Sequence, residues 1–158
     1  PLPDVRRRVD EVLEFAGLSE LADRMPTEIS GGQRRRVGIA RAMASNPELL
    51  LFDDPTTGLD PLTAASVDEE VVKLRDLQQV TTLVATHQIR DAFYIATHTA
   101  TKTPEGAQVS TAENPDATHA EFMVLHDGRI HFQGNAAELL ASEDEYLKEF
   151  LYNTLPPW

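Results

Sequence analysis

The sequence predicts an α/β domain built around a parallel sheet, and three observations lead to this fold class. The chain has 158 residues with 41% apolar content, which is enough for one domain with a genuine core. A short, continuous apolar run from Leu49 to Phe52 predicts a parallel strand covered on both faces. A helical pattern from Pro61 to Gln78 separates it from a second strand, Thr81 to Thr86. A strand, helix and strand of this length form a right-handed parallel crossover.

Helical segments precede the first strand. Residues 4 to 16 carry apolar side chains at helical spacing, with Asp4 placed to cap the helix and Gly17 to end it. A second, short helix is expected over residues 19 to 24, before Pro26. A third is expected to begin after Ser30 and to end before Pro47.

The start of the third helix is a candidate anion site. Ser30 is a good N-cap, and Gly31 and Gly32 follow it directly. Helix N-termini expose unpaired N–H groups and the positive end of the helix dipole, and glycine lets the backbone approach a phosphate closely. The alternative is an ordinary serine cap followed by two flexible glycines.

The predicted crossover gathers polar residues at one edge of the sheet. Asp53 and Asp54 follow the first strand and His87 follows the second. The carboxyl ends of parallel strands meet at one edge, where ligands bind in open α/β sheets. Two adjacent carboxylates repel each other unless a positive charge lies near them. We therefore expect a metal ion with phosphates at this edge.

The helix that follows is expected to have Asp60 at its N-cap and Pro61 at its first position. Its inner face is expected to consist of Leu62, Val67, Val71 and Leu74.

Composition excludes several classes of protein. The formal net charge of −12 argues against a nucleic-acid-binding surface and against direct binding to lipid surfaces. The chain has no cysteine, which excludes disulfides and thiolate metal sites and indicates a reducing compartment. No apolar run reaches the roughly 20 residues needed to span a bilayer. The chain begins with Pro1 instead of Met, and we expect a truncated product.

Four motifs occur in one order between residues 29 and 87: ISGGQ, the strand ending in Asp53, PTTGLD and His87. Together they resemble the ATP-binding-cassette (ABC) ATPases, in which they correspond to the signature motif, Walker B, the D-loop and the switch histidine. Residues 124 to 142 resemble the closing hairpin of that family, with a turn at His126-Asp127-Gly128 and a helix after Gly134. The resemblance implies an incomplete P-loop NTPase-like core with part of the helical signature subdomain.

The resemblance also implies roles for individual residues. Asp53 would hold Mg²⁺, Asp54 would be the general base, and His87 would contact the γ-phosphate and order the attacking water. Asp60 would communicate between two ATP sites in a head-to-tail dimer with a second ATPase subunit. The signature residues would grip the γ-phosphate of an ATP bound mainly by the opposite subunit; they are Ser30, Gly31, Gly32 and Gln33.

Two departures from the family pattern affect this expectation. The catalytic carboxylate after Walker B is usually Glu, whereas this chain has the shorter Asp54, so slow hydrolysis is expected. No GxxxxGK followed by Ser or Thr occurs, and the glutamine loop and adenine-stacking aromatic have no counterpart either. We therefore expect that an N-terminal portion is absent, that a strand is missing between residues 81–86 and 121–125, and that this chain alone is inactive.

The implied function is ATP hydrolysis coupled to transport by transmembrane permease subunits, at the inner face of the cytoplasmic membrane. SGGQRRRV, THQIRDAFYIATH and SEDEYLKEFL are also similar to the ATPases of bacterial lipid-transport systems of the mammalian-cell-entry (Mce) type, which predicts lipids as cargo. Two alternatives remain: a soluble ABC ATPase of translation or chromosome maintenance, and a non-catalytic fragment that only binds partners.

Four regions are expected along the chain. Residues 1–47 form the helical remnant, 48–96 the α/β core, and 120–158 a closing hairpin with helices. Residues 97–119 look inserted, either as an exposed β-hairpin around Pro104-Glu105-Gly106 or as a disordered loop.

The end of the chain carries a further pair of alternatives. An apolar stripe on a short helix is expected to pack on its own domain, while a partner-docking tail ending in Trp158 is the alternative. His126 and His131 flank the closing hairpin and are candidate metal ligands. No other residue pattern in the sequence supports this role. The stripe consists of Tyr146, Leu147, Phe150 and Leu151.

Overall fold

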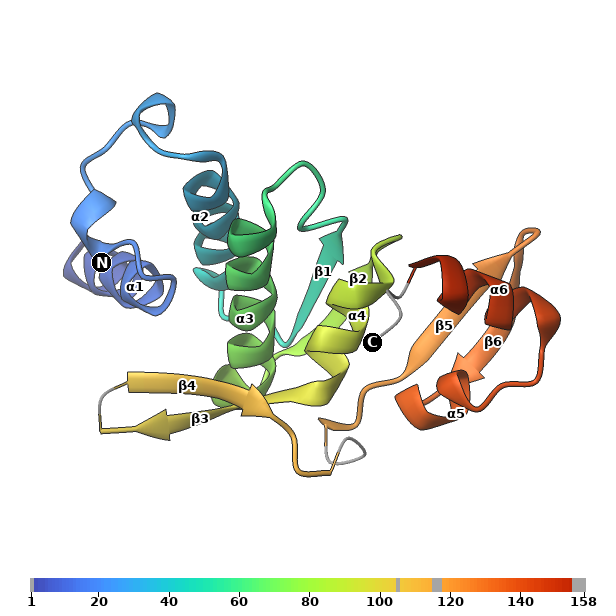
Figure 1. The fold of residues 1–158 in the computed structure, drawn as a ribbon. Coiled ribbons are helices and arrows are strands. Elements are labelled where there is room, and N and C mark those ends of the chain that lie inside the picture. Colours follow the sequence, from blue (N-terminus) through green and yellow to red (C-terminus); the bar gives the residue numbers. More distant parts are fainter. Residues whose placement is uncertain (1, 105, 115–117, 155–158) are drawn as a thin grey trace.

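The structure is a computed structural model that describes residues 2–104, 106–114 and 118–154 (Figure 1). The helices are α1 (Leu2–Phe15), α2 (Gly31–Met43), α3 (Pro61–Gln78), α4 (Ile89–Thr97), α5 (Ala136–Leu140) and α6 (Glu145–Thr154), with 3₁₀ turns at Ser19–Leu21 and Pro26–Glu28. The strands are β1 (Leu49–Asp53), β2 (Thr81–Ala85), β3 (His98–Thr103), β4 (Gly106–Thr111), β5 (Phe122–His126) and β6 (Arg129–Gly134).

The predicted α/β fold class is confirmed by the crossover of β1, α3 and β2. β1 and β2 pair in parallel, from Leu49 opposite Thr81 to Asp53 opposite Ala85. Helix α3 connects the two strands and lies against one face of the pair, beside α2 (Figure 1). The register brings the carboxyl ends of both strands to the same edge.

The expectation that β1 is covered on both faces is wrong. Leu50 points to the helices and is 8% exposed, whereas Leu49 and Leu51 on the other face are 52% and 69% exposed. Leu83 of β2 is half-exposed on the same sheet. The apolar run is continuous, but in the described part of the chain nothing covers this second face.

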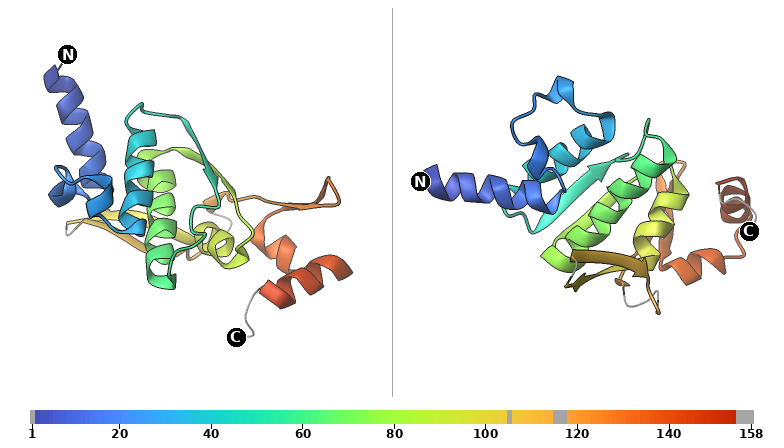
Figure 2. Two further views of the ribbon diagram at one scale, coloured as in Figure 1. Left: turned by 90° about the horizontal axis from the view of Figure 1, so that it is seen from above. Right: turned by 60° about the vertical axis from the view of Figure 1, so that its left-hand side comes forward.

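Among the described residues, the strands form three separate two-stranded sheets. The β1–β2 pair is one, and β3–β4 and β5–β6 are antiparallel hairpins. Strand β2 is not paired with β5, which leaves these edges open where the missing strand was expected. Figure 2 shows the closing hairpin and its helices set apart from the α1–α2 region, with α3 and α4 between them.

The N-terminal helices differ from expectation in detail. Asp4 lies in the first turn of α1 and does not precede it, because the helix begins at Leu2. The helix expected over residues 19 to 24 is only a single 3₁₀ turn. Gly17 ends α1 with a positive φ of 63°, which an L side chain rarely adopts. The core between α1, α2 and α3 contains Val12, Ala16, Ile39, Met43 and Val67.

Helix α3 begins and ends where the sequence predicts. Its face toward the core includes Val67, Val71 and Leu74, all almost fully buried. Leu62 is 83% exposed, so its assignment to the inner face is wrong. It lies in the first turn of the helix, and no described element covers it there.

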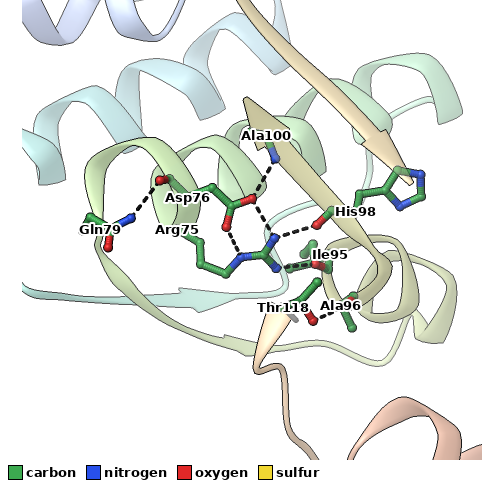
Figure 3. Close-up of polar contacts among 8 residues, drawn as sticks. All are labelled: Arg75, Asp76, Gln79, Ile95, Ala96, His98, Ala100 and Thr118. Carbon is green, nitrogen blue, oxygen red and sulfur yellow. Dashed lines mark hydrogen bonds and ion pairs between the residues drawn. The ribbon is translucent and has the colours of Figure 1, made fainter. Parts of the chain in front are cut away.

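Residues 98–111 form a β-hairpin that is attached to the core. Ala100 of β3 is buried in a cluster with Val71, Val72 and Ile95. Arg75 of α3 donates hydrogen bonds to the carbonyls of Ile95 and His98, at 2.7 and 2.6 Å (Figure 3). Residues 105 and 115–117 of this region lie outside the described residues.

The C-terminal stripe packs on the chain's own hairpin, and α4 lies against the same cluster. Leu147 is 1% exposed and contacts a core that includes Phe122 and Leu139, with the remaining stripe residues packed around it. Trp158, on which the partner-docking alternative rests, lies outside the described residues.

Candidate functional site

The fold brings together the three polar residues predicted at the edge of the sheet. Asp53 is the last residue of β1, Asp54 follows it, and His87 follows β2. The Asp54 N–H donates to the Ala85 carbonyl at 2.8 Å, which extends the strand pairing by one residue. Asp54 then turns with a φ of 43°, a left-handed conformation that aspartate tolerates better than most side chains.

Asp54 and His87 are in direct contact. The Asp54 Oδ1 atom lies 3.0 Å from the His87 Nδ1 atom and accepts a hydrogen bond from the His87 backbone N–H at 3.3 Å. Partial desolvation raises the pKa of the Asp54 carboxyl, but the hydrogen bonds from His87 and the charge of its ring together outweigh it and hold the pKa below its ordinary value. Asp54 is therefore ionised at neutral pH and oriented by the histidine.

Asp53 is exposed at the end of β1 and is suited to a metal held mainly by other ligands. No group of three or more His, Asp or Glu residues that could hold a metal occurs in the described part of the chain. Mg²⁺ often keeps several waters and takes only one or two carboxylates together with substrate phosphates. A single accessible carboxylate therefore fits Mg²⁺ bound with a nucleotide, but not a cation bound by protein alone.

The side chains of Ser30 and Gln33 form a capping box at the start of α2. The Gln33 N–H donates to Ser30 Oγ at 3.2 Å, and the Ser30 N–H donates to Gln33 Oε1 at 2.8 Å. The reciprocal contact fixes the first turn of α2, where the sequence predicts an anion site at the N–H groups and the positive end of the helix dipole.

The two glycines of this turn differ in their surroundings. A Cβ at Gly32 would lie 2.1 Å from Thr63 Cγ2 of α3, so Gly32 is required for the packing of the two helices. A Cβ at Gly31 would meet only Arg34 and Leu59 atoms at 3.9 Å. The sequence predicted both glycines as phosphate-binding, without the packing role of Gly32.

Asp60 is the N-cap of α3. Its carboxylate accepts from the N–H groups of Leu62 and Thr63, both at 3.1 Å, and from the Thr63 hydroxyl at 2.5 Å. These bonds, led by the one from the Thr63 hydroxyl, lower the pKa of the carboxyl. Thr63 thus contacts Asp60 and also lies against Gly32, which joins the start of α3 to the start of α2.

Sequence reasoning missed a second set of contacts beside Asp54 and His87. Thr56 is 1% exposed, and its hydroxyl donates to the Asp91 carboxylate and accepts from the Gln88 side-chain amide at 2.9 Å. Gln88 and Asp91 lie at the start of α4, directly after His87. A threonine between Pro55 and Thr57 in a turn sequence gave no signal of burial.

A groove of about 290 Å³ lies beside Asp53, between α2 and β1. Its lining includes Arg34, Arg35 and Pro55, so two cations face the acidic end of β1. Arg35 donates to the Thr57 carbonyl at 3.4 Å.

His126 and His131 contact an aromatic ring. His126 stacks on Tyr146 with ring centroids 3.8 Å apart, and His131 lies 3.1 Å from an Asp144 oxygen. They belong to no three-ligand cluster among the described residues. Nothing in this arrangement supports the metal alternative.

The sequence is similar to that of known proteins. A family model described as ABC transporter matches residues 4–57. A methionine import ATP-binding protein, MetN, of Corynebacterium diphtheriae is 40% identical over 147 residues, which cover 79% of this chain and 43% of that protein. The chain thus spans less than half the length of this relative.

Solved structures share the fold. The cbiO1 protein of Clostridium perfringens, described as part of the ABC transporter complex cbiONQ, matches with a TM-score of 0.69 and 27% identity over 96% of this chain and 51% of its own. The ATP-binding cassette MJ0796, solved as a dimer bound to ADP and phosphate, matches with a TM-score of 0.56 and 30% identity over 82% of this chain and 46% of its own.

No helix in the described ranges has both the length and the apolar character needed to cross a bilayer. The ABC transporter model covers α1, α2 and β1, and the structural matches extend over nearly the whole chain. Sequence and fold therefore agree: residues 4–57 match the ABC transporter family, and the fold is similar to that of ABC ATP-binding cassettes.

Proposed function

We propose that the protein to which this chain belongs hydrolyses ATP and couples that hydrolysis to transport by membrane partner subunits. The observation that carries the proposal is the contact of 3.0 Å between Asp54 and His87 at the carboxyl ends of two parallel strands. A carboxylate oriented by a histidine at this edge can position and deprotonate a water molecule that attacks a phosphate.

The remaining site residues have complementary roles in this proposal. Asp53 would hold Mg²⁺, which neutralises charge on the phosphates when bound. The first turn of α2, with Ser30, Gly31, Gly32 and Gln33, presents N–H groups to the γ-phosphate of an ATP molecule held mainly by a second subunit. Asp60, fixed as the cap of α3, connects this turn to the dimer interface through Thr63.

Asp54 makes hydrolysis slow in this proposal. Aspartate is one methylene shorter than the glutamate usual in the family, so its oxygen lies farther from the attacking water unless the loop moves inward. A displacement of about 1 Å can cost on the order of 10²-fold in rate. The lowered pKa of Asp54 weakens it further as a base.

The proposed partners are a second ATPase subunit and transmembrane permease subunits, met at the cytoplasmic face of the membrane. The dimeric form of MJ0796 and the place of cbiO1 in a transporter complex support these assignments. Nucleic acid is not a proposed partner, because the net charge is −12.

For the cargo, the methionine import proteins of the MetN type favour methionine. Lipid transport rests on the resemblance of three short segments to Mce-type ATPases, and these relatives give it no support. Neighbouring genes separate the two: a permease beside a methionine-binding protein favours amino-acid import, and a permease beside a Mce-domain protein favours lipids.

ATPase assays would test the proposed activity directly. The chain would be joined to the N-terminal half of a related cassette that carries the GxxxxGK loop, and turnover would be measured with Mg-ATP. We expect slow turnover that Asp54→Asn and His87→Ala each reduce by about 10²-fold, with ATP affinity almost unchanged.

Asp54→Glu reports the position of the loop. If Asp54→Glu turns over faster than the parent, the aspartate of the parent lies too far from the attacking water. If Asp54→Glu turns over more slowly than the parent, the loop that carries Asp54 has moved inward. An Asp54→Asn variant as active as its parent would contradict the assignment of Asp54 as the general base. Equal loss of ATP binding and turnover in His87→Ala would make the histidine structural.

A further inference from the structure

Partly buried polar contacts join the two segments that carry the proposed catalytic pair. The loop after β1 contains Asp54 and Thr56, while His87 and Gln88 follow β2 and Asp91 lies in the first turn of α4. The Thr56 hydroxyl donates its single hydrogen to the Asp91 carboxylate and accepts from the Gln88 side-chain amide at 2.9 Å. The hydroxyl therefore both donates to and accepts from residues that follow β2.

The direct contact between Asp54 and His87 is too exposed to fix the geometry alone. Their side chains are 40% and 70% exposed, and polar contacts in water contribute little because water competes for both partners. Thr56, in contrast, is 1% exposed, and a hydrogen bond in a buried setting is stronger and more directional.

The covalent connection makes Thr56 an effective support for Asp54. Only Pro55 separates the two residues; it is buried, and its ring restricts the backbone. On the other side, Gln88 directly follows His87, and its N–H donates to Thr86 Oγ1 at 3.0 Å. The positions of Asp54 and His87 are therefore linked through a short, partly buried path.

We propose that Thr56, held by Gln88 and Asp91, is a positioning residue that sets the distance between Asp54 and His87. The proposal rests on the proposed function, in which these two groups act on the water and the γ-phosphate. Thr56 touches neither reactant in this account and acts only through the two loops that it joins.

A test on the chain itself would use hydrogen exchange of the His87 backbone amide, which donates to Asp54. Thr56→Val removes the hydroxyl and keeps the shape, Thr56→Ser keeps the hydroxyl, and Thr118→Val is the matched control. Thr118 is a similarly buried threonine whose hydroxyl donates to the Ala96 carbonyl at 2.7 Å, away from both loops.

We expect the His87 amide to exchange about tenfold faster in Thr56→Val than in the parent, because the local opening of the loop becomes easier. Thr56→Ser and Thr118→Val should exchange at nearly the parent rate at this amide. An unchanged rate in Thr56→Val, or an equal acceleration in Thr118→Val, would overturn the positioning role.

The second test uses the completed cassette described above. Thr56→Val should lower kcat by about tenfold or more while KM for ATP stays within about twofold, and Thr56→Ser should restore kcat. A parent cassette without turnover overturns the proposed function itself. A fully active Thr56→Val in a cassette that does turn over overturns the positioning role alone.

Discussion

Gly32 lies in the first turn of α2, against the first turn of α3. Its missing side chain leaves room for the Thr63 methyl group, while the Thr63 hydroxyl donates to the Asp60 carboxylate. Thr63 therefore packs on a glycine of α2 and binds the N-cap aspartate of its own helix. This contact holds the first turns of α2 and α3 together.

Gly32→Ala should destabilise the fold by about 1–3 kcal/mol, because the added methyl group overlaps Thr63 Cγ2. The double variant Gly32→Ala with Thr63→Ser should recover most of that loss, since serine lacks the overlapping methyl and keeps the hydroxyl. Urea unfolding of both proteins measures the difference.

Gly31→Ala is the matched control, because its Cβ would have open space. It should change the free energy of unfolding little. If the double variant were no more stable than Gly32→Ala alone, the steric account of Gly32 would be contradicted.

Asp68 on α3 is a buried carboxyl group whose hydrogen-bonding capacity is not fully used. Its Oδ1 atom has no hydrogen-bond partner, and burial, followed by the charge of Asp91, raises its pKa to about 7. The unfolded chain has an ordinary aspartate pKa of about 3.9. Between about pH 4 and pH 7, the folded protein therefore holds a proton on Asp68 that the unfolded chain has released.

The stability contributed by protonated Asp68 should be fully present below about pH 4 and should be lost as pH rises toward about 7. Asp68→Asn keeps a neutral side chain at every pH. The melting temperature of Asp68→Asn relative to the parent should therefore rise by several degrees between pH 5 and pH 8, as measured by circular dichroism. A constant difference across this range would show that Asp68 titrates normally.

At the scale of the elements, the β3–β4 hairpin is attached to α3 by one ionic group. Asp76 binds Arg75 through both carboxylate oxygens, at 2.6 and 2.9 Å, and accepts from the Ala100 N–H at 2.7 Å (Figure 3). Arg75 in turn donates to backbone carbonyls at the end of α4 and the start of β3. Two neighbouring residues of α3 thus hold α4 and the hairpin together.

Asp76→Ala should cost about 2 kcal/mol or more, because the Ala100 N–H loses its side-chain acceptor and the partly buried Arg75 guanidinium loses its counter-charge. Urea unfolding measures the loss, and proteolysis within residues 98–111 should become faster. The control is Glu11→Ala, which breaks the surface pairs with Arg7 and Arg8 and should cost under about 1 kcal/mol. Equal losses in both variants would contradict the anchoring role.

The elements that depend on local sequence patterns were predictable. The limits of α3 follow from Asp60, Pro61 and the apolar spacing, and the parallel order of β1 and β2 follows from the length of the crossover. Helix α4 and the attachment of the hairpin were not predicted, because they depend on contacts between distant residues such as Asp76 and Ala100. The same limit applies to Thr56, whose burial depends on α4.

At the scale of the whole molecule, the chain has an acidic site without a phosphate-binding loop. Asp53 and Asp54 face outward at the end of β1, and no GxxxxGK sequence occurs anywhere in the chain. The leucines at 49, 51 and 83 form an uncovered apolar face beside this site. Both features agree with the proposal that this edge of the sheet contributes one part of an ATP site.

The chain by itself should show no saturable binding of Mg-ATP at micromolar concentrations. The triphosphate would lack the backbone loop and lysine that cradle it, and Asp53 and Asp54 alone repel it without a tightly held metal. Isothermal titration calorimetry measures this directly. A micromolar dissociation constant for the chain alone would contradict the prediction and require a different phosphate site.

The separation of the strands into three small sheets also affects how the chain folds. Among the described residues, the strand pairing with the largest sequence separation joins Leu49 with Thr81 across a single helix, and the other two pairings are hairpins of consecutive strands. Pairings between segments close in sequence cost little loop-closure entropy and form quickly. The β1–α3–β2 unit can therefore assemble early, so that the edge carrying Asp54 and His87 exists before any further strand is added to the sheet.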